Sequence, residues 1–353
     1  MIRNPFAKNL VGLDIGSRTV KALSLKKKGR GYALDKFFFY DLKDTAKAYP
    51  KDANPGEALR AGVSLQALQD HPFAAGVPDR EVIHLALELP RLKEAELRTA
   101  VKHELSELTG IPAEELAFDF LVLDGPAEAE KISVSAYGSH RRHVDNVVKL
   151  ATSARLKPSR VESDTIAIAA ALDFNGYIER DKSYAVFDLG EGHLTASLVQ
   201  GGEVRLSKTF ENGWGSLNAL LQEKFGISYA EAEAHKQRYD FNAQAGADPA
   251  IEQAIDEAYA AIFSDFKRSL ELFADFSPNA PKMDQMLLTG GASQTPNLPR
   301  VLEMFFKVPV EAANPFRRIE IYAEGPASDE IGRLAPFMMA ALGLALSDKK
   351  EAA

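Results

Sequence analysis

The sequence contains no cysteine, no apolar run long enough to cross a membrane and no excess of positive charge. The lack of cysteine excludes disulfide bonds and thiolate metal sites, and it fits a reducing compartment. The longest apolar stretch, PFMMAALGLALS near the C-terminus, is well short of the ~20 residues that a membrane-spanning helix needs. The N-terminal segment MIRNPFAKNL lacks the apolar core of a signal peptide, so we expect a cytoplasmic protein.

The charge balance narrows the classes of partner. Lys and Arg number 42 against 50 Asp and Glu, which gives a net charge of −8 and argues against general binding to nucleic acid or to anionic membranes. The chain is 46% hydrophobic and 26% charged, as soluble globular proteins are. Its 353 residues predict two or more lobes.

Two familiar nucleotide-binding motifs are absent. No Gly-x-x-x-x-Gly-Lys-[Ser/Thr] occurs, which excludes a P-loop. The pair Gly190-x-Gly192 matches only part of the dinucleotide fingerprint, and a strand follows it where that fold requires a helix.

An interrupted hairpin occurs twice in the chain. In LVGLDIGSRTVKALSL, residues 10–25, a strand ends at Asp14 and Gly16, and a second strand follows a short polar loop. The segment AVFDLGEGHLTASLVQGG repeats this layout, and Asp188 and Gly190 follow Asp14 and Gly16 by 174 residues each. A further strand follows each copy. We therefore predict two half-molecules of related design.

The repeated loops have the chemistry of a site for a metal-bound phosphate. A carboxylate at a strand end can hold Mg²⁺ directly or through water, and a glycine lets backbone N–H groups approach phosphate oxygens. One Asp-x-Gly turn is weak evidence, but two at matched positions can face one polyphosphate across a cleft. The hydroxyl groups that can add donors belong to Ser17, Thr19 and Thr195.

A third glycine turn lies in LLTGGASQTPNLPRVL. Gly290 and Gly291 follow a buried strand and precede a predicted helix, with Ser293 and Thr295 as candidate caps. Such a turn can accept an anion or let a flat ring lie against bare backbone. It can equally be an ordinary tight connection, and the residues leave both interpretations open.

The remaining patterns give the organisation of the chain. Residues 43–60 are predicted to be a polar loop and residues 64–73 a short helix. Residues 78–155 read as strand, helix, strand, strand, helix, a set that can form a small inserted domain. Helical periodicity then dominates from residue 216 to residue 273.

At this point the sequence resembles a known family. Asp14-Ile-Gly-Ser, Asp188-Leu-Gly and Leu288-Thr-Gly-Gly-Ala are similar to the two phosphate motifs and the adenosine motif of the actin and sugar-kinase superfamily. The segments GLDIGSRTVKALSL, LPRLKEAELRTAVKHELSELTGIPAEELAFDF, LATSARLKPSRVESDTIAIAAAL and FMMAALGLAL resemble the PilM family, which is close to the cell-division protein FtsA. The resemblance covers nearly the whole chain.

The resemblance implies an α/β, actin-like ATPase fold of the duplicated ribonuclease H-like type. Two lobes would surround a nucleotide cleft, and a small α+β domain would be inserted. The implied parts are an actin-like subdomain 1A (1–77, 156–183 and 325–353), an inserted subdomain 1C (78–155), an actin-like subdomain 2A (184–235 and 281–324) and a helical subdomain 2B (236–280).

The same resemblance implies roles for individual residues. Asp14 and Asp188 would hold Mg²⁺, either directly or through its waters. The residues implied to bind ATP are Gly16, Ser17, Arg18, Thr19, Gly190, Gly192, His193, Thr195, Lys236, Gly290, Gly291 and Ser293. The second loop departs from the family pattern at Glu191 and His193, and Gly213-Trp-Gly215 stands where a Gly-Gly pair is common.

The implied function is that of an ATP-binding cytoplasmic adaptor in type IV pilus assembly or a related transformation or secretion system. Its partner would be the N-terminal tail of a PilN-like inner-membrane protein, with indirect links to a PilO-like protein and to pilus motor ATPases. The protein would then be peripheral to the inner membrane through that partner, without inserting into it. Self-association, as in an FtsA-like filament, remains an alternative.

Catalysis is a separate question. Glu162 and Asp164 stand at the predicted strand–helix junction before the second half, and they are the only carboxylates that we can place between the two loops in space. Asp164 is also well placed as a helix N-cap. We expect slow ATP hydrolysis or none, because gripping phosphates does not position an attacking water. The alternative is a small-molecule kinase of the same superfamily with Asp164 as general base.

Overall fold

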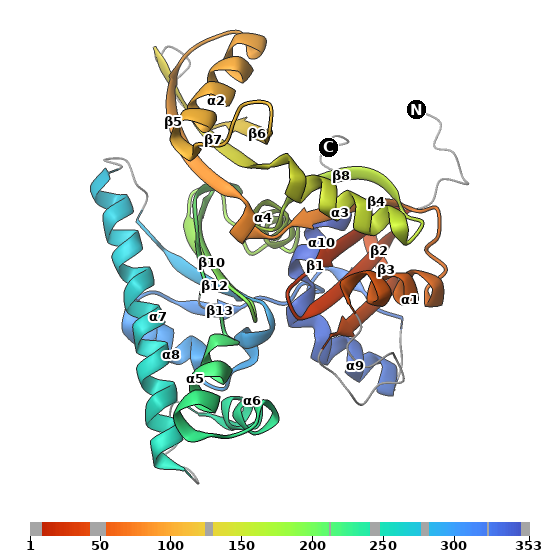
Figure 1. Ribbon diagram of the computed structural model, residues 1–353, viewed down its shortest axis with the longest axis vertical. Coiled ribbons are helices and arrows are strands. Elements are labelled where there is room, and N and C mark those ends of the chain that lie inside the picture. The colour runs from red at the N-terminus through yellow and green to blue at the C-terminus, as the bar shows by residue number, and fades with distance from the viewer. Residues whose placement is uncertain are drawn as a thin grey trace.

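Three β-sheets organise the part of the chain that the structure describes (Figure 1). The computed structural model describes residues 9–42, 54–123, 130–211, 213–240, 248–276, 282–322 and 325–346. The strand orders are β14-β3-β2-β1-β4-β8, β11-β10-β9-β12-β13 and β5-β7-β6. We call the bodies built on these sheets the first lobe, the second lobe and the insert.

The first lobe begins with the interrupted hairpin. Strands β1, β2 and β3 are antiparallel neighbours, and β4 and β8 extend the sheet in parallel from β1. The strands of this sheet are β1 (Val11–Ile15), β2 (Thr19–Lys28), β3 (Gly31–Asp41), β4 (Pro72–Val77), β8 (Lys157–Ser163) and β14 (Ile319–Glu320). The two halves of the hairpin meet in register at Asp14 and Lys21.

The second lobe repeats this plan. Strands β9, β10 and β11 are antiparallel neighbours, and β12 and β13 extend the sheet in parallel from β9. Its strands are β9 (Ser183–Leu189), β10 (Leu194–Gln200), β11 (Glu203–Phe210), β12 (Gln285–Thr289) and β13 (Val310–Ala312). Asp188 lies opposite Thr195, as Asp14 lies opposite Lys21. The predicted duplication is therefore confirmed in strand order, direction and register.

The insert projects from the top of the view in Figure 1. It consists of β5 (Ile83–Pro90), α2 (Glu94–Thr109), β6 (Leu116–Val122) and β7 (Lys131–His140). The apolar positions Leu97, Val101 and Leu105 of α2 are buried against the sheet, and Gly110 ends the helix in the left-handed conformation. Helix α3 (Arg141–Ser153) lies in the predicted range of the insert, but Ala151 and its neighbours pack in the core of the first lobe.

The remaining helices cover the two larger sheets. The first lobe carries α1 (Pro55–Leu65), α4 (Asp164–Phe174), α9 (Pro326–Leu334) and α10 (Met339–Leu346). The second lobe carries α5 (Ser216–Phe225), α6 (Tyr229–Arg238), α7 (Pro249–Phe276) and α8 (Leu298–Phe306). Helices α4 and α10 share a core cluster with β2 of the first lobe and β9 of the second lobe, so they lie between the two sheets. Both are apolar on nearly all sides, as central buried helices are.

Backbone contact at α10 depends on glycine. A Cβ on Gly12 of β1 would lie 1.9 Å from the carbonyl oxygen of Ala341, and one on Gly343 would lie 1.7 Å from that of Ala167. Since no side chain fits at those distances, the two glycines allow α10 to press directly on β1 and α4.

The predictions for residues 43–60 and 64–73 were wrong in part. Residues 43–53 lie outside the described residues, and helix α1 already begins at Pro55, where Asn54 and Glu57 form a capping box. The helix then ends at Leu65, turns follow over residues 66–71 of the predicted helix, and β4 begins at Pro72. Gly62 lowers the helical propensity of this segment in the sequence. The packing requires a glycine there, because a Cβ would lie 2.3 Å from the Phe38 ring.

Within the described ranges, no helix has both the length and the apolar character that crossing a bilayer requires.

Candidate functional site

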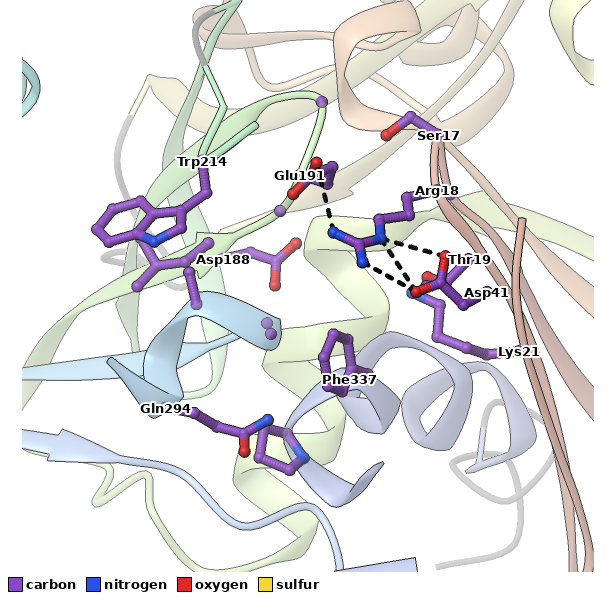
Figure 2. Close-up of a pocket in the computed structure, with 18 of the residues that line it drawn as sticks. Ser17, Arg18, Thr19, Lys21, Asp41, Asp188, Glu191, Trp214, Gln294 and Phe337 are labelled. Carbon is purple, nitrogen blue, oxygen red and sulfur yellow. Dashed lines mark hydrogen bonds and ion pairs between the residues drawn. The ribbon is translucent and has the colours of Figure 1, made fainter. Parts of the chain in front are cut away.

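A cleft of about 550 Å³ lies between the two lobes. Both interrupted hairpins contribute to its wall, as do the turn after β12, helix α6 and the segment around η3 (Ala335–Met338). Figure 2 shows the side chains that point into it from the two sides. Predicted site residues that line it are Asp14, Gly16, Ser17, Arg18, Thr19, Asp164, Asp188, Gly190, Gly192, His193, Lys236, Gly290 and Gly291.

Three predicted residues do not line the cleft. Thr195 is buried in the sheet, where its hydroxyl lies 3.3 Å from that of Thr209. Ser293 donates its hydroxyl hydrogen to the Gly290 carbonyl at 2.7 Å, so it stabilises the turn, and the cap of α8 is Asn297. Glu162 lies on β8 outside the lining, with its carboxylate 4.0 Å from the guanidinium of Arg160.

An ion pair stands at the end of the first hairpin. The Lys21 ammonium lies 2.5 Å from a carboxylate oxygen of Asp14, and the two side chains are only 11% and 8% exposed. Burial alone would lower the pKa of Lys21, but the adjacent Asp14 carboxylate raises it, so the lysine is charged. The pair follows from the strand register, which places the two residues directly opposite each other.

Asp188 occupies the matching position in the second lobe. Thr289 at the end of β12 donates its hydroxyl hydrogen to Asp188 at 2.9 Å. Burial raises the pKa of Asp188, and the positive charge of Lys21 opposes that rise. The two lobes therefore present one carboxylate already paired and one carboxylate with a single hydroxyl donor.

Asp164 is the one predicted catalytic candidate in the cleft. Its Oδ1 is buried and has no hydrogen-bond partner in the described part of the chain. Burial raises its pKa well above the usual range, and the negative charge of Asp14 adds to the effect. The N-cap prediction was wrong, because Ser163 occupies that position and Asp164 is the first residue of α4. Gly76 leaves room for the carboxyl group, since a Cβ there would lie 1.7 Å from Oδ1.

The second loop is held by the segment Gly213-Trp-Gly215. The Trp214 N–H donates to the Gly190 carbonyl at 2.9 Å, and the Gly215 N–H donates to the Glu191 carbonyl at 2.7 Å. A Cβ on Gly213 would lie 2.3 Å from the His193 nitrogen. These contacts explain why glycine flanks the buried tryptophan. They leave His193 in the cleft with a buried Nδ1 for which the described residues supply no partner.

The third turn exposes backbone toward the same cleft. Gly290 has φ +83°, and a Cβ there would lie 2.7 Å from the Leu189 carbonyl oxygen. A Cβ on Gly291 would lie 2.1 Å from the Phe337 ring, so that ring covers the glycine closely. Gln294 and Phe337 then flank one end of the cleft (Figure 2).

Charged side chains converge at the opposite end. Arg18 contacts Asp41 at 3.0 Å, and Lys236 contacts Glu233 at 2.8 Å and Glu191 at 3.7 Å. Burial would raise the pKa of Glu233, but the Lys236 ammonium and several hydrogen bonds hold it at about 2. The acidic Glu191, unexpected beside a phosphate site, is therefore paired with protein cations.

Sequence reasoning missed several of these groups. Lys21 could have been found by pairing the residues across the hairpin from Asp14. Asp41, Gln294 and Phe337 gave no such signal, because each comes from a segment whose own pattern predicts only a strand end, a turn or an apolar helix.

The two-lobed architecture, the duplicated sheets and the central cleft define an actin-like fold. The structure superposes on that of MreB5 of Spiroplasma citri bound to ADP with a TM-score of 0.52 at 13% identity over 98% of each chain. The same protein bound to AMPPNP gives 0.51 at 12% identity, again over 98% of each chain. A much stronger superposition, with a TM-score of 0.80 at 20% identity over 96% of this chain and 98% of the other, is with a structure described as the PilM-PilN type IV pilus biogenesis complex.

The family follows from the sequence match. The profile of the family described as type IV pilus assembly protein PilM matches residues 12–349, and the chain belongs to that family.

Proposed function

We propose that the protein is an ATP-binding adaptor whose cleft holds a nucleotide with Mg²⁺. The observation that carries this proposal is the facing pair of hairpins, each with an aspartate at its strand end and bare glycine backbone in its loop. Two buried polar atoms in the same cleft, Asp164 Oδ1 and His193 Nδ1, lack partners among the described residues. Buried polar groups normally have partners, so these atoms fit a polar ligand.

Different residues of the cleft would contact the phosphates, the nucleoside and the magnesium ion. Gly16, Gly190 and Gly192 let backbone N–H groups approach phosphate oxygens, and Lys21 supplies positive charge beside them. Gly290 and Gly291 would back the nucleoside, with Phe337 alongside. The magnesium ion would neutralise phosphate charge next to Asp14 and Asp188. No three acidic or histidine side chains of the described residues converge on one metal position, so phosphate and water would supply its other ligands.

The site is poorly equipped for hydrolysis. Asp164 is the only predicted base that lines the cleft, and its raised pKa favours the neutral acid, which cannot accept a proton from water. We therefore propose slow turnover or none, as expected of a regulatory nucleotide and not of a kinase.

The proposed partner is the N-terminal cytoplasmic tail of a PilN-like inner-membrane protein. Membership of the PilM family and the superposition on a PilM-PilN complex support it. The protein would then act in the cytoplasm, peripheral to the inner membrane, with PilO-like proteins and motor ATPases reached indirectly.

Calorimetry with Mg²⁺ and ATP or ADP tests the nucleotide proposal. We expect wild-type protein to bind, and Asp188→Ala and Asp14→Ala to bind at least tenfold more weakly because each removes a group beside the phosphates (about 1.4 kcal/mol or more). Asp119→Ala, an exposed aspartate of the insert, serves as the control and should bind normally. Absence of binding by correctly folded wild-type protein would refute the site.

The same samples decide between adaptor and enzyme. Phosphate release should be negligible, and rapid release abolished by Asp164→Asn would favour the kinase alternative.

Titration with a synthetic PilN-like tail peptide tests the proposed partner. The protein should bind this peptide and should not bind a scrambled one.

A further inference from the structure

Arg18 joins the two lobes directly. It leaves the turn between β1 and β2, and its guanidinium contacts Asp41 of the same lobe through hydrogen bonds of 3.1 Å. The same group reaches across the cleft, where Nη1 donates to the Tyr229 hydroxyl at 2.9 Å. It also lies 3.6 Å from Glu191 and 3.7 Å from Glu233. Figure 2 shows the guanidinium between Asp41 and Glu191.

The far side of this contact is itself organised. The Tyr229 hydroxyl donates to Glu191 at 2.7 Å, and Asn218 donates to Glu233 at 2.7 Å. Lys236 lies between the two glutamates and compensates part of their charge. The arginine therefore meets acceptors that are already fixed in place, which reduces the entropy lost on forming the contact. We call Arg18, Asp41, Glu191, Tyr229 and Glu233 the interlobe cluster.

A second contact closes the cleft at the same end. The loops of the two hairpins approach so closely that a Cβ on Gly192 would lie 2.5 Å from the Ser17 hydroxyl oxygen. Ser17 adjoins Arg18, and Gly192 adjoins Glu191, so the steric contact and the ionic contact lie side by side. Both contacts are made by groups of the chain itself, so they form without a ligand.

We propose that the interlobe cluster is a clasp that holds the lobes together, so that the cleft opens only when Arg18 releases the second lobe. The clasp is asymmetric, because Asp41 anchors the guanidinium to the first lobe while the acceptors across the cleft come from the second. Opening therefore breaks the contacts to Glu191, Tyr229 and Glu233 and leaves that to Asp41 intact. High salt weakens the clasp, since the ions involved are partly exposed.

Distance measurements between spin labels test this without any nucleotide. The chain has no cysteine, so Ser64→Cys on α1 and Glu223→Cys on α5, both exposed, place one label on each lobe. In this background Arg18→Ala should increase the population with long label separations roughly three- to tenfold, as expected for a partly buried ion-pair cluster. Arg18→Lys should give an intermediate value, because one ammonium cannot serve Asp41 and the second lobe together.

Two further variants keep the test valid even if the Arg18→Ala protein folds poorly. Tyr229→Phe should raise the long-distance population less than Arg18→Ala, and Gly192→Ala should raise it by wedging the loops apart. The matched control is Arg98→Ala, which removes an arginine-aspartate pair confined to the insert. Raising the salt to about 1 M should open the wild type toward the Arg18→Ala distribution. Identical distance distributions for wild type, Arg18→Ala and Tyr229→Phe would overturn the proposal, whether or not the cleft binds ATP.

Discussion

At the scale of single residues, the ion pair of Asp14 and Lys21 shows how a buried charge is tolerated. Each side chain is almost fully enclosed, and each lies opposite the other in a regular antiparallel ladder. Taking either charge out of water is expensive, and only the attraction of the partner offsets the cost. Removing one partner should therefore be far worse than removing both.

Lys21→Met should lower the free energy of unfolding by about 3–5 kcal/mol, because it leaves the Asp14 carboxylate buried and unpaired. The double variant Asp14→Asn, Lys21→Met should recover more than half of that loss. Lys28→Met removes an exposed pair with Glu320 and should cost less than about 1 kcal/mol. Urea denaturation measures all three, and equal losses in the single and double variants would contradict the pairing argument.

The residues of the cleft were predictable only where they stand at the end of a strand that the sequence itself predicts. Asp14, Asp188 and the loop glycines follow from the repeated pattern, since a strand that ends at an acid and a glycine must present both at its end. The contacts of Arg18 could not be predicted, because Tyr229 and Glu233 come from a helix more than 200 residues away in the sequence. Local patterns carry no information on such encounters.

At the scale of elements, the insert is fastened to the second lobe by a small polar cluster. His84 of β5 stacks on Tyr137 of β7, with ring centroids 4.5 Å apart, and its Nε2 lies 2.7 Å from the Ser135 hydroxyl. Ser135 in turn donates to the Val204 carbonyl of β11 at 2.9 Å. Burial lowers the pKa of His84 to about 4, so the folded protein keeps this ring neutral.

The stability of the protein should therefore fall as the pH drops from 6.5 toward 4. Over that range the unfolded state takes up a proton on His84 that the folded state refuses, which favours unfolding. Between pH 7.5 and pH 5 the wild type should lose about 2 kcal/mol more than His84→Gln does. Denaturation of both proteins at a series of pH values measures the difference, and parallel pH profiles would show that His84 contributes nothing.

The prediction of helices and strands succeeded for long periodic segments and failed for segments composed mainly of small residues. Helix α2 carries a regular apolar face and a terminal glycine, and it follows β5 as the predicted order of the insert has it. Strand β4, PFAAGV, lacks the β-branched and aromatic residues typical of strands at most of its positions, yet it lies inside its sheet, between β1 and β8, and is nearly all buried. Its small side chains suit the space beneath α10 and beside Asp164, a reason that lies in the tertiary structure.

At the scale of the whole molecule, close packing around α10 joins distant parts of the chain. Gly343 touches the backbone of α4, and Gly12 of β1 touches the backbone of α10. Such contacts do not yield to a side-chain rotation, because both partners are main-chain atoms in regular elements.

Two helical glycines should respond oppositely to alanine. Gly343→Ala forces α10 away from α4 and should destabilise the protein by about 2–4 kcal/mol. Gly332 lies on the exposed side of α9, where a Cβ would have no atom within 4 Å, so Gly332→Ala should stabilise the protein by about 0.5–1 kcal/mol. Thermal unfolding of the two variants gives the signs, and a neutral Gly343→Ala would refute the packing argument.

The plan of the first lobe also bears on synthesis of the protein. Its sheet begins with β1 near the N-terminus, yet α10, which packs on β1, consists of residues 339–346. Translation at about 5–20 residues per second separates the two by tens of seconds. During that interval the nascent chain carries an apolar hairpin without its covering helix, while the second lobe, which is contiguous from β9 to β13, can already fold. We therefore expect the second lobe to be complete on the ribosome before the first lobe, and the face of the opening hairpin that α10 covers to stay exposed in the meantime.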